Sequence, residues 1–157
     1  MQNLYDEVAS LDDRCYEKFA LSEDILMENA ASGMANFIRS KFSKHSKVII
    51  VCGSGNNGAD GIACARLLHV DYDVSIFYAK KPKSKMALLQ YKRAKNIGIK
   101  ESQKIEDCDV LVDAVVGTGF CGKFYDHLKV VMQEMNSVNA YKIACDIPSG
   151  GAFKADI

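Results

Sequence analysis

Three aspartates each lie in or beside a polar, glycine-containing stretch that follows an apolar run: Asp60 in 53–61, Asp113 just before 116–123, and Asp146 at the start of 146–150. Carboxylates gathered at one place repel one another unless a proton or a cation lies among them. Such a group could supply an acid or base, a cation site, or both. Because His45, His69 and His127 have no plausible Ser or Cys partner, acid–base work falls to the aspartates.

Oxygen-bearing side chains in the same stretches could hold a cation. Asn57, Asp113 and Ser149 offer an amide, a carboxylate and a hydroxyl oxygen. Such hard ligands favour an alkali or alkaline-earth ion over zinc. No Cys/His spacing in the sequence is typical of a zinc site.

The stretch 53–61 has the G-x-G-x-x-G spacing, through Gly53, Gly55 and Gly58, between an apolar run and a helix-like run. This is the context of a dinucleotide-binding turn. Asp60, however, would repel phosphate near a helix start. The stretch is therefore expected to hold a polar group, and phosphate alone does not explain it.

The stretch 117–123, Gly-Thr-Gly-Phe-Cys-Gly-Lys, is the better candidate for binding phosphate. It offers glycine N–H groups, the Thr118 hydroxyl and the Lys123 charge, and it contains no acid.

Alternating strand and helix patterns position these stretches. Strands are expected at 47–52, 74–78, 110–115 and 142–145, and helices at 5–20, 22–42, from the first glycine stretch to 69, 84–96 and 125–136. The alternation predicts a Rossmann-like three-layer α/β/α sandwich with a mainly parallel sheet. In such sheets ligands bind outside the carboxyl ends of the strands, where all three polar stretches fall.

Length and composition narrow the class of protein. The 157 residues are enough for one domain with a substantial core. Lys+Arg and Asp+Glu both number 20, so net charge gives no attraction to nucleic acid or membrane. The sequence has no signal segment, no run of about 18 apolar residues and no C-x-x-C among its six cysteines. A cytoplasmic, reducing compartment fits best.

Four motifs occur together and in order: Leu26-Met27-Glu28-Asn29-Ala30, then 55–61, 113–120 and 146–150. In combination they resemble the YjeF N-terminal domain family, the NAD(P)H-hydrate epimerases. The resemblance spans nearly the whole chain. It implies a Rossmann-like domain that interconverts the R and S forms of hydrated NADH and NADPH and holds one potassium ion per subunit.

The resemblance also assigns residues by motif position. It places potassium on Asn57, Asp113 and Ser149. It places substrate contacts on Asn56, Asn57, Gly58, Ala59, Asp60, Gly117, Thr118, Gly119, Phe120, Cys121, Gly122, Lys123 and Asp146. We expect Asp146 to be the catalytic acid, with Asp60 as the second candidate.

The chain departs from the family pattern in two places. Ala59 stands where the family usually has glycine, and 151–153 replaces an acidic Leu-Asp stretch. We expect a single YjeF N-terminal-like domain over residues 1–157 that lacks the family's C-terminal strands. A homodimer, and fusion to or cooperation with an ADP-dependent hydrate dehydratase, are compatible with the resemblance.

Two other functions stay open at this point. Domains of similar sequence also act as non-catalytic interaction scaffolds that bind nucleotide or RNA, and the basic stretch 80–100 would be the surface for it. Against a scaffold, every polar loop residue of the motifs is present. A conventional NAD-dependent dehydrogenase is the other possibility. Against it, Lys80 and Lys81 follow the second strand where an acid would hold the ribose.

Overall fold

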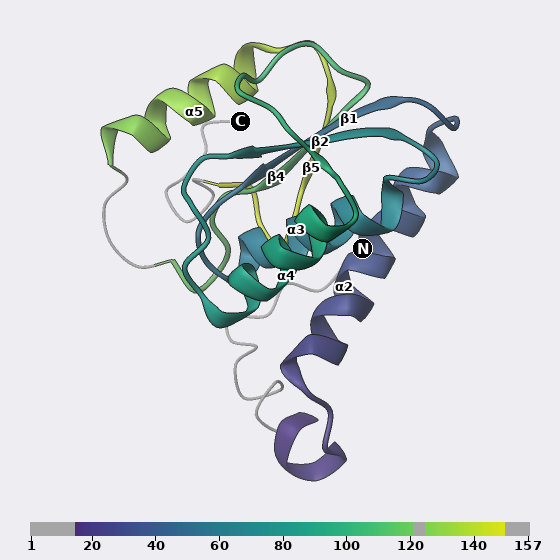
Figure 1. The fold of residues 1–157 in the computed structure, drawn as a ribbon. Helices are drawn as coiled ribbons and strands as arrows, with labels where there is room; N and C mark the ends of the chain where they lie inside the picture. Colours follow the sequence, from purple (N-terminus) through teal and green to yellow (C-terminus); the bar gives the residue numbers. More distant parts are fainter. Residues whose placement is uncertain (1–14, 121–124, 150–157) are drawn as a thin grey trace, which may run out of the picture.

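The computed structural model describes residues 15–120 and 125–149. Strands and helices alternate along these residues (Figure 1): α2 (Glu23–Lys41), β1 (Lys47–Cys52), α3 (Asn56–Leu68), β2 (Asp73–Tyr78), α4 (Lys85–Asn96), β3 (Lys100–Glu101), β4 (Val110–Ala114), α5 (Asp126–Ser137) and β5 (Tyr141–Ala144). Within the described residues, all five strands form one parallel sheet in the order β3-β2-β1-β4-β5. The predicted α/β fold with a parallel sheet is confirmed.

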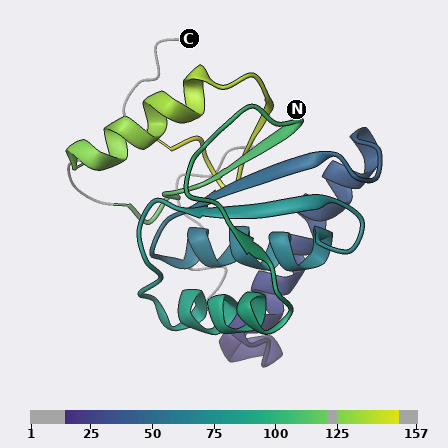
Figure 2. The ribbon, with the colours of Figure 1, turned by 45° about the horizontal axis from the view of Figure 1, so that its top comes forward.

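Helices cover both faces of the sheet. Figures 1 and 2 show α2, α3 and α4 on one face and α5 on the other. The central strand β1 is buried along nearly its whole length. Its residues Val48 and Ile50 belong to the core under α3, whereas Ile49 and Val51 belong to the core under α5. Burial on both faces explains why this strand is a continuous apolar run in the sequence.

Local signals in the sequence fix several helix ends. Ser22 and Ser84 cap α2 and α4. Each side chain accepts a hydrogen bond from the backbone N–H group three residues later, that of Ile25 or Ala87. Gly98 follows α4 with φ +77°, a conformation in which glycine ends many helices. These predicted helix boundaries are confirmed.

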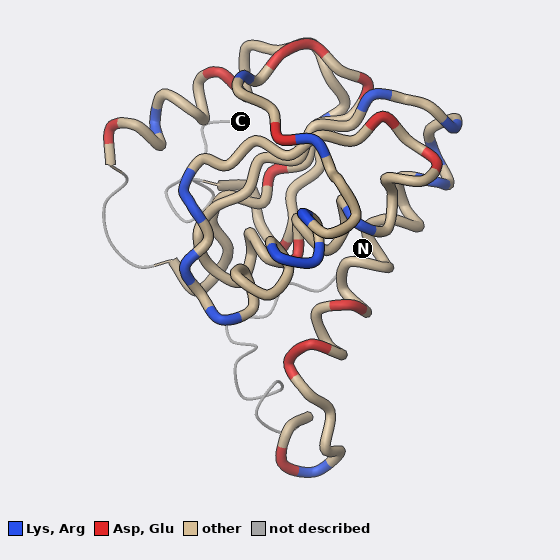
Figure 3. Tube along the Cα trace, viewed as in Figure 1, with Lys and Arg blue, Asp and Glu red and all other residues tan. Residues whose placement is uncertain are grey.

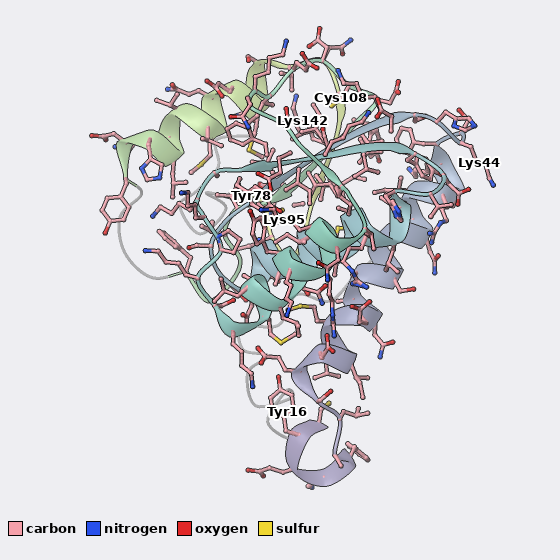
Figure 4. The ribbon with its side chains drawn as sticks, in the orientation of Figure 1. Tyr16, Lys44, Tyr78, Lys95, Cys108 and Lys142 are labelled. Carbon is pink, nitrogen blue, oxygen red and sulfur yellow. The ribbon has the colours of Figure 1, made fainter. Side chains whose placement is uncertain are left out.

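Helix α4 also packs against the end of β2. Tyr78 and Tyr91 meet edge to face with ring centroids 5.4 Å apart. The Lys95 ammonium lies 5.5 Å from the Tyr91 ring centroid, and Figure 4 shows Tyr78 and Lys95 close together beside α4. These contacts hold the carboxyl end of β2 in place.

A polar network joins α2 to α3 and α4. Glu28 accepts hydrogen bonds from Arg66 at 2.6 Å and from the fully buried Gln90 at 3.2 Å. Arg93 binds both carboxylate oxygens of Asp24, at 2.6 and 2.7 Å. In Figure 3 the acidic positions of α2 lie toward the basic positions of α4. Glu28, which belongs to the first of the four sequence motifs, therefore helps to anchor α2.

The structure differs from the predicted elements in two places, and a third prediction is only partly covered by the described residues. The two-residue strand β3 was not predicted, because Lys100 and Glu101 are exposed and carry no apolar pattern. Residues 56–61, predicted as loop, form the first turns of α3. Residues 15–19 of the expected first helix 5–20 are helical, Ala20 is not, and residues 5–14 lie outside the described residues.

Candidate functional site

A cavity of about 890 Å³ lies at the carboxyl ends of the strands. Neighbouring strands β1 and β4 lead to helices on opposite faces of the sheet, and this divergence opens a crevice between their loops. The cavity is lined by Ala30, Gly33, Met34, Phe37, Gly53, Ser54, Gly55, Asn56, Asn57, Asp60, Lys80, Val115, Val116, Gly117, Thr118, Gly119, Phe120, Leu128, Ile143, Ala144, Cys145 and Asp146.

Two glycines allow the loops around the cavity to approach one another. A Cβ at Gly58 would lie 2.1 Å from the carbonyl oxygen of Gly53, so the first turn of α3 can lie against the end of β1 only without a side chain there. A Cβ at Gly117 would lie 2.6 Å from Asp146 Oδ2 and 3.3 Å from Asn57 Cγ. Gly117 therefore marks the point where the first, second and third polar stretches meet.

Asp113 and Ser149 form a tight pair beneath the cavity. The Ser149 backbone N–H donates to Asp113 Oδ2 at 2.7 Å, and the Ser149 hydroxyl donates to Asp113 Oδ1 at 2.5 Å. The backbone N–H of Val116 in turn donates to Ser149 Oγ at 3.1 Å. These bonds tie the end of β5 to the end of β4.

The Asn57 side chain lies next to Gly117. Both its oxygen and its nitrogen are buried, and within the described residues neither has a hydrogen-bond partner. Leaving a buried amide unpaired costs about 1–3 kcal/mol. The residue also borders the cavity. An amide held in this way is suited to bind a cation or a polar group of a ligand.

Asp146 occupies a strained and exposed position at the cavity. Its φ of +68° lies in the left-handed region, which residues other than glycine seldom adopt. Its Oδ2 accepts hydrogen bonds from the backbone N–H of Thr118 at 2.7 Å and from the Thr118 hydroxyl at 2.9 Å. Such strain persists where surrounding contacts enforce it, and it is common at active sites.

Asp60 lies in the second turn of α3 and lines the cavity. The negative charge of Asp60 affects the pKa of Cys145, a buried thiol that also lines the cavity. Burial raises the Cys145 pKa most, and the negative charge of Asp60 raises it next, followed by smaller effects that include Asp146 and Asp113. The three predicted carboxylates therefore all lie near Cys145, although they come from α3, β4 and the end of β5.

The helix start at the cavity lacks the usual side-chain cap. Gly55 precedes α3 and provides no side chain, and the first turn contains no acid. Asn56 instead turns toward α2, where its amide donates to Glu23 Oε1 at 2.7 Å. The backbone N–H groups of this turn are a further polar feature of the cavity wall.

The remaining predicted substrate-binding residues differ in their position relative to the cavity. Gly117, Thr118, Gly119 and Phe120 line the cavity, whereas Gly58 and Ala59 are buried within α3. Cys121, Gly122 and Lys123 lie outside the described residues.

Sequence reasoning missed the wall that α2 contributes. Ala30, Gly33, Met34 and Phe37 face the cavity with the spacing of one helix face. That pattern is visible in the sequence, but it indicates core packing as readily as a ligand site.

A family model described as "YjeF-related protein N-terminus" matches residues 23–155. A bifunctional NAD(P)H-hydrate repair enzyme from Helicobacter pylori is 42% identical over 174 aligned residues, which cover all of this chain and 37% of the relative. An NAD(P)H-hydrate epimerase from Elusimicrobium minutum is 33% identical, with 96% of this chain and 80% of the relative covered.

The fold has a solved counterpart as well. The crystal structure of the yeast protein ynu0 superposes with a TM-score of 0.74 at 21% identity, covering 96% of this chain and 72% of the yeast chain. The fold, with its cavity at the strand ends, is that of a Rossmann-like domain. With the family match, the chain belongs to the YjeF N-terminal family. It spans little more than a third of the length of the Helicobacter pylori relative, whose coverage is 37%.

Proposed function

We propose that this domain is an NAD(P)H-hydrate epimerase, which interconverts the R and S forms of hydrated NADH and NADPH. The observation that carries the proposal is the exposed Asp146 carboxylate, held by Thr118 in a left-handed conformation at the cavity. Relatives named as epimerases support it. The scaffold alternative is not favoured, because the curated relatives are named as repair enzymes or epimerases.

Asp146 is the proposed acid and base. Both bonds from Thr118 engage Oδ2, so Oδ1 is the oxygen that would carry the proton. Asp146 donates that proton to the hydroxyl on the hydrated carbon. The C–O bond breaks, water leaves with the bonding electrons, and the ring nitrogen lone pair completes an iminium ion. Water then adds to either face and returns the proton to the carboxylate.

A potassium ion fits the residues present. Asn57, Asp113 and Ser149 offer only oxygen ligands with a single negative charge, a set suited to a monovalent cation. The buried Asn57 amide, for which the described part of the chain provides no hydrogen-bond partner, supports this assignment. Bound there, potassium would supply positive charge that offsets the repulsion among the aspartates.

The substrate is proposed to lie with its diphosphate at 117–123 and its altered nicotinamide toward Asp60 and Asp146. Lys123 and the glycine N–H groups favour phosphate at 117–123, whereas Asp60 disfavours it at 53–61. The Thr118 N–H and hydroxyl are bonded to Asp146, so the other donors of 117–123 are the ones proposed to bind phosphate. The uncapped start of α3 is the competing phosphate site. Phosphates found on Asn56 and Asn57 in a complex with bound nucleotide would reverse the assignment.

The direct test starts from one purified hydrate epimer. The R/S ratio is followed by chromatography in the presence of potassium. We expect the wild-type chain to bring the ratio to equilibrium. Asp146→Asn should lower the rate at saturating substrate by about 100-fold or more, within the range that a positioned acid contributes, with little change in affinity. Equal rates for the two proteins would exclude Asp146 as the acid.

The assembly of the whole protein is also a proposal. A homodimer and cooperation with an ADP-dependent hydrate dehydratase follow from the family resemblance, and several relatives are named as bifunctional. None of the described helices is long and apolar enough to cross a membrane.

A further inference from the structure

The charges around the cavity are arranged asymmetrically. Among the described residues that line it, Asp60 and Asp146 are the acids and Lys80 is the one cation. Lys80 follows β2, whereas Asp146 follows β5, and β1 and β4 lie between these strands. Three strand spacings separate the two residues by roughly 14 Å along the edge of the sheet. The cavity therefore has an acidic end and a basic end.

The basic end is held in place by backbone hydrogen bonds. Ala79 N–H donates to the Cys52 carbonyl at 2.9 Å, which extends the pairing of β2 with β1. The N–H groups of Lys83 and Ser84 both donate to the Ser54 carbonyl, at 2.9 and 3.1 Å. The segment that carries Lys80 is thus fixed against the loop after β1, at the start of α3.

The Lys80 ammonium is positioned without being neutralised. It lies 4.4 Å from the ring centroid of Tyr125, close enough for a cation–π contact. Within the described residues Lys80 forms no ion pair with a carboxylate. A half-buried ammonium held over an aromatic ring keeps its charge available for an anionic ligand.

The end of β2 is also where nucleotide-binding folds of this type distinguish their cofactors. An acid at this place accepts a hydrogen bond from the ribose 2′-hydroxyl, whereas a basic residue accommodates a 2′-phosphate. Residues 79–84 read Ala-Lys-Lys-Pro-Lys-Ser and contain no acid. The chain thus offers a cation, and no acceptor carboxylate, at the position of the adenosine ribose.

We propose that Lys80 binds the 2′-phosphate of NADPH hydrate and makes the site prefer NADPH hydrate over NADH hydrate. The proposal rests on the epimerase function above. It places the adenosine end of the substrate at Lys80 and the hydrated ring at Asp146, with the diphosphate between them. The separation of the two charged ends along the sheet matches this extended placement.

The test compares kcat/KM for the two hydrates in wild type and variants. We expect wild type to favour NADPH hydrate by about tenfold or more, the effect of one charge-assisted contact. Lys80→Ala should raise KM for NADPH hydrate about tenfold and change KM for NADH hydrate less than twofold. Lys80→Arg should keep most of the preference. Lys81→Ala, which removes an exposed charge that does not line the cavity, is the matched control and should leave the preference unchanged.

Two outcomes of the kinetics would overturn the proposal. An equal loss on both hydrates would place Lys80 at the diphosphate, and an unchanged preference in Lys80→Ala would remove it from the phosphates altogether. Calorimetry with 2′,5′-ADP and with 5′-ADP separates this question from catalysis. Tighter binding of 2′,5′-ADP that is lost in Lys80→Ala supports the subsite even if no epimerisation is found. Epimerisation without such binding refutes the subsite and leaves the proposed function standing.

Discussion

Adding one methyl group at Gly117 should displace the proposed catalytic acid. In Gly117→Ala the new Cβ would lie 2.6 Å from Asp146 Oδ2 and 3.3 Å from Asn57 Cγ. The first distance is well inside van der Waals contact. The Asp146 carboxylate is the end of a side chain and can rotate away, whereas the backbone around Gly117 is held by the hydrogen bonds of Val116 N–H to Ser149 Oγ and of Phe120 N–H to the Gly117 carbonyl. The carboxylate must then leave its two hydrogen bonds to Thr118.

The size of the effect follows from these contacts. Two hydrogen bonds to a charged group are lost, but Asp146 is exposed and water replaces them. We therefore expect the free energy of unfolding to fall by about 1–2 kcal/mol, near the lower end of what such bonds contribute. Turnover should fall by about 100-fold, the effect of moving a catalytic group by about 1 Å.

The same loop provides the matched control. Among the residues that the structure describes, none has an atom within 4 Å of a Cβ placed at Gly119. Gly119→Ala should change the free energy of unfolding by less than about 0.5 kcal/mol. Urea unfolding and the R/S assay at saturating substrate measure both variants. If Gly117→Ala retains wild-type turnover, the Asp146 carboxylate is not where the chemistry takes place.

Three further variants test other parts of the structure. Asp113→Ala should abolish the dependence of activity on potassium, and added potassium should not restore activity; a potassium titration that matches wild type would exclude the assignment. Glu28→Gln should lower the free energy of unfolding by about 1–2 kcal/mol, because the half-buried Arg66 guanidinium loses its charged partner. Urea midpoints measure this, with the exposed Glu134→Gln as the control, and equal midpoints would contradict it. The ammonium groups of Lys104 and Lys47 lower the pKa of Glu106 from 4.5 to about 2. Because the folded-state pKa is the lower one, the stabilisation is complete above pH 4.5 and is lost as the pH falls toward 2. The urea midpoint of Glu106→Gln should therefore fall less than that of wild type between pH 4.5 and about 2. An equal fall of the midpoint in the two proteins would contradict the ion pairs.

The sequence predicts the fold well because most of its signals are local. The buried strand β1 is a continuous apolar run, and the serines before α2 and α4 are good capping residues. Gly98 is likewise a local stop signal. Each of these depends on residues within one or two turns of the chain.

The features of the structure that the sequence does not predict depend on partners far away in the sequence. Glu28 binds Arg66, 38 residues later, and nothing near Glu28 indicates that contact. The unpartnered state of Asn57 depends on burial by loops from three strands. The start of α3 was predicted as loop because Asn-Asn-Gly is a weak helix former and no side chain caps it.

These local irregularities meet at one place in the molecule. The uncapped start of α3, the buried Asn57 amide, which has no hydrogen-bond partner among the described residues, and the left-handed Asp146 all border the same cavity. Each is unfavourable by itself, and the well-packed core that includes the fully buried Ala59 and Ile62 of α3 offsets the cost. Sequences usually agree with their folds at every level, and they depart from that agreement mainly at functional sites. The coincidence of three such departures supports catalysis at this cavity over a scaffold role, since a scaffold would have no need to retain them.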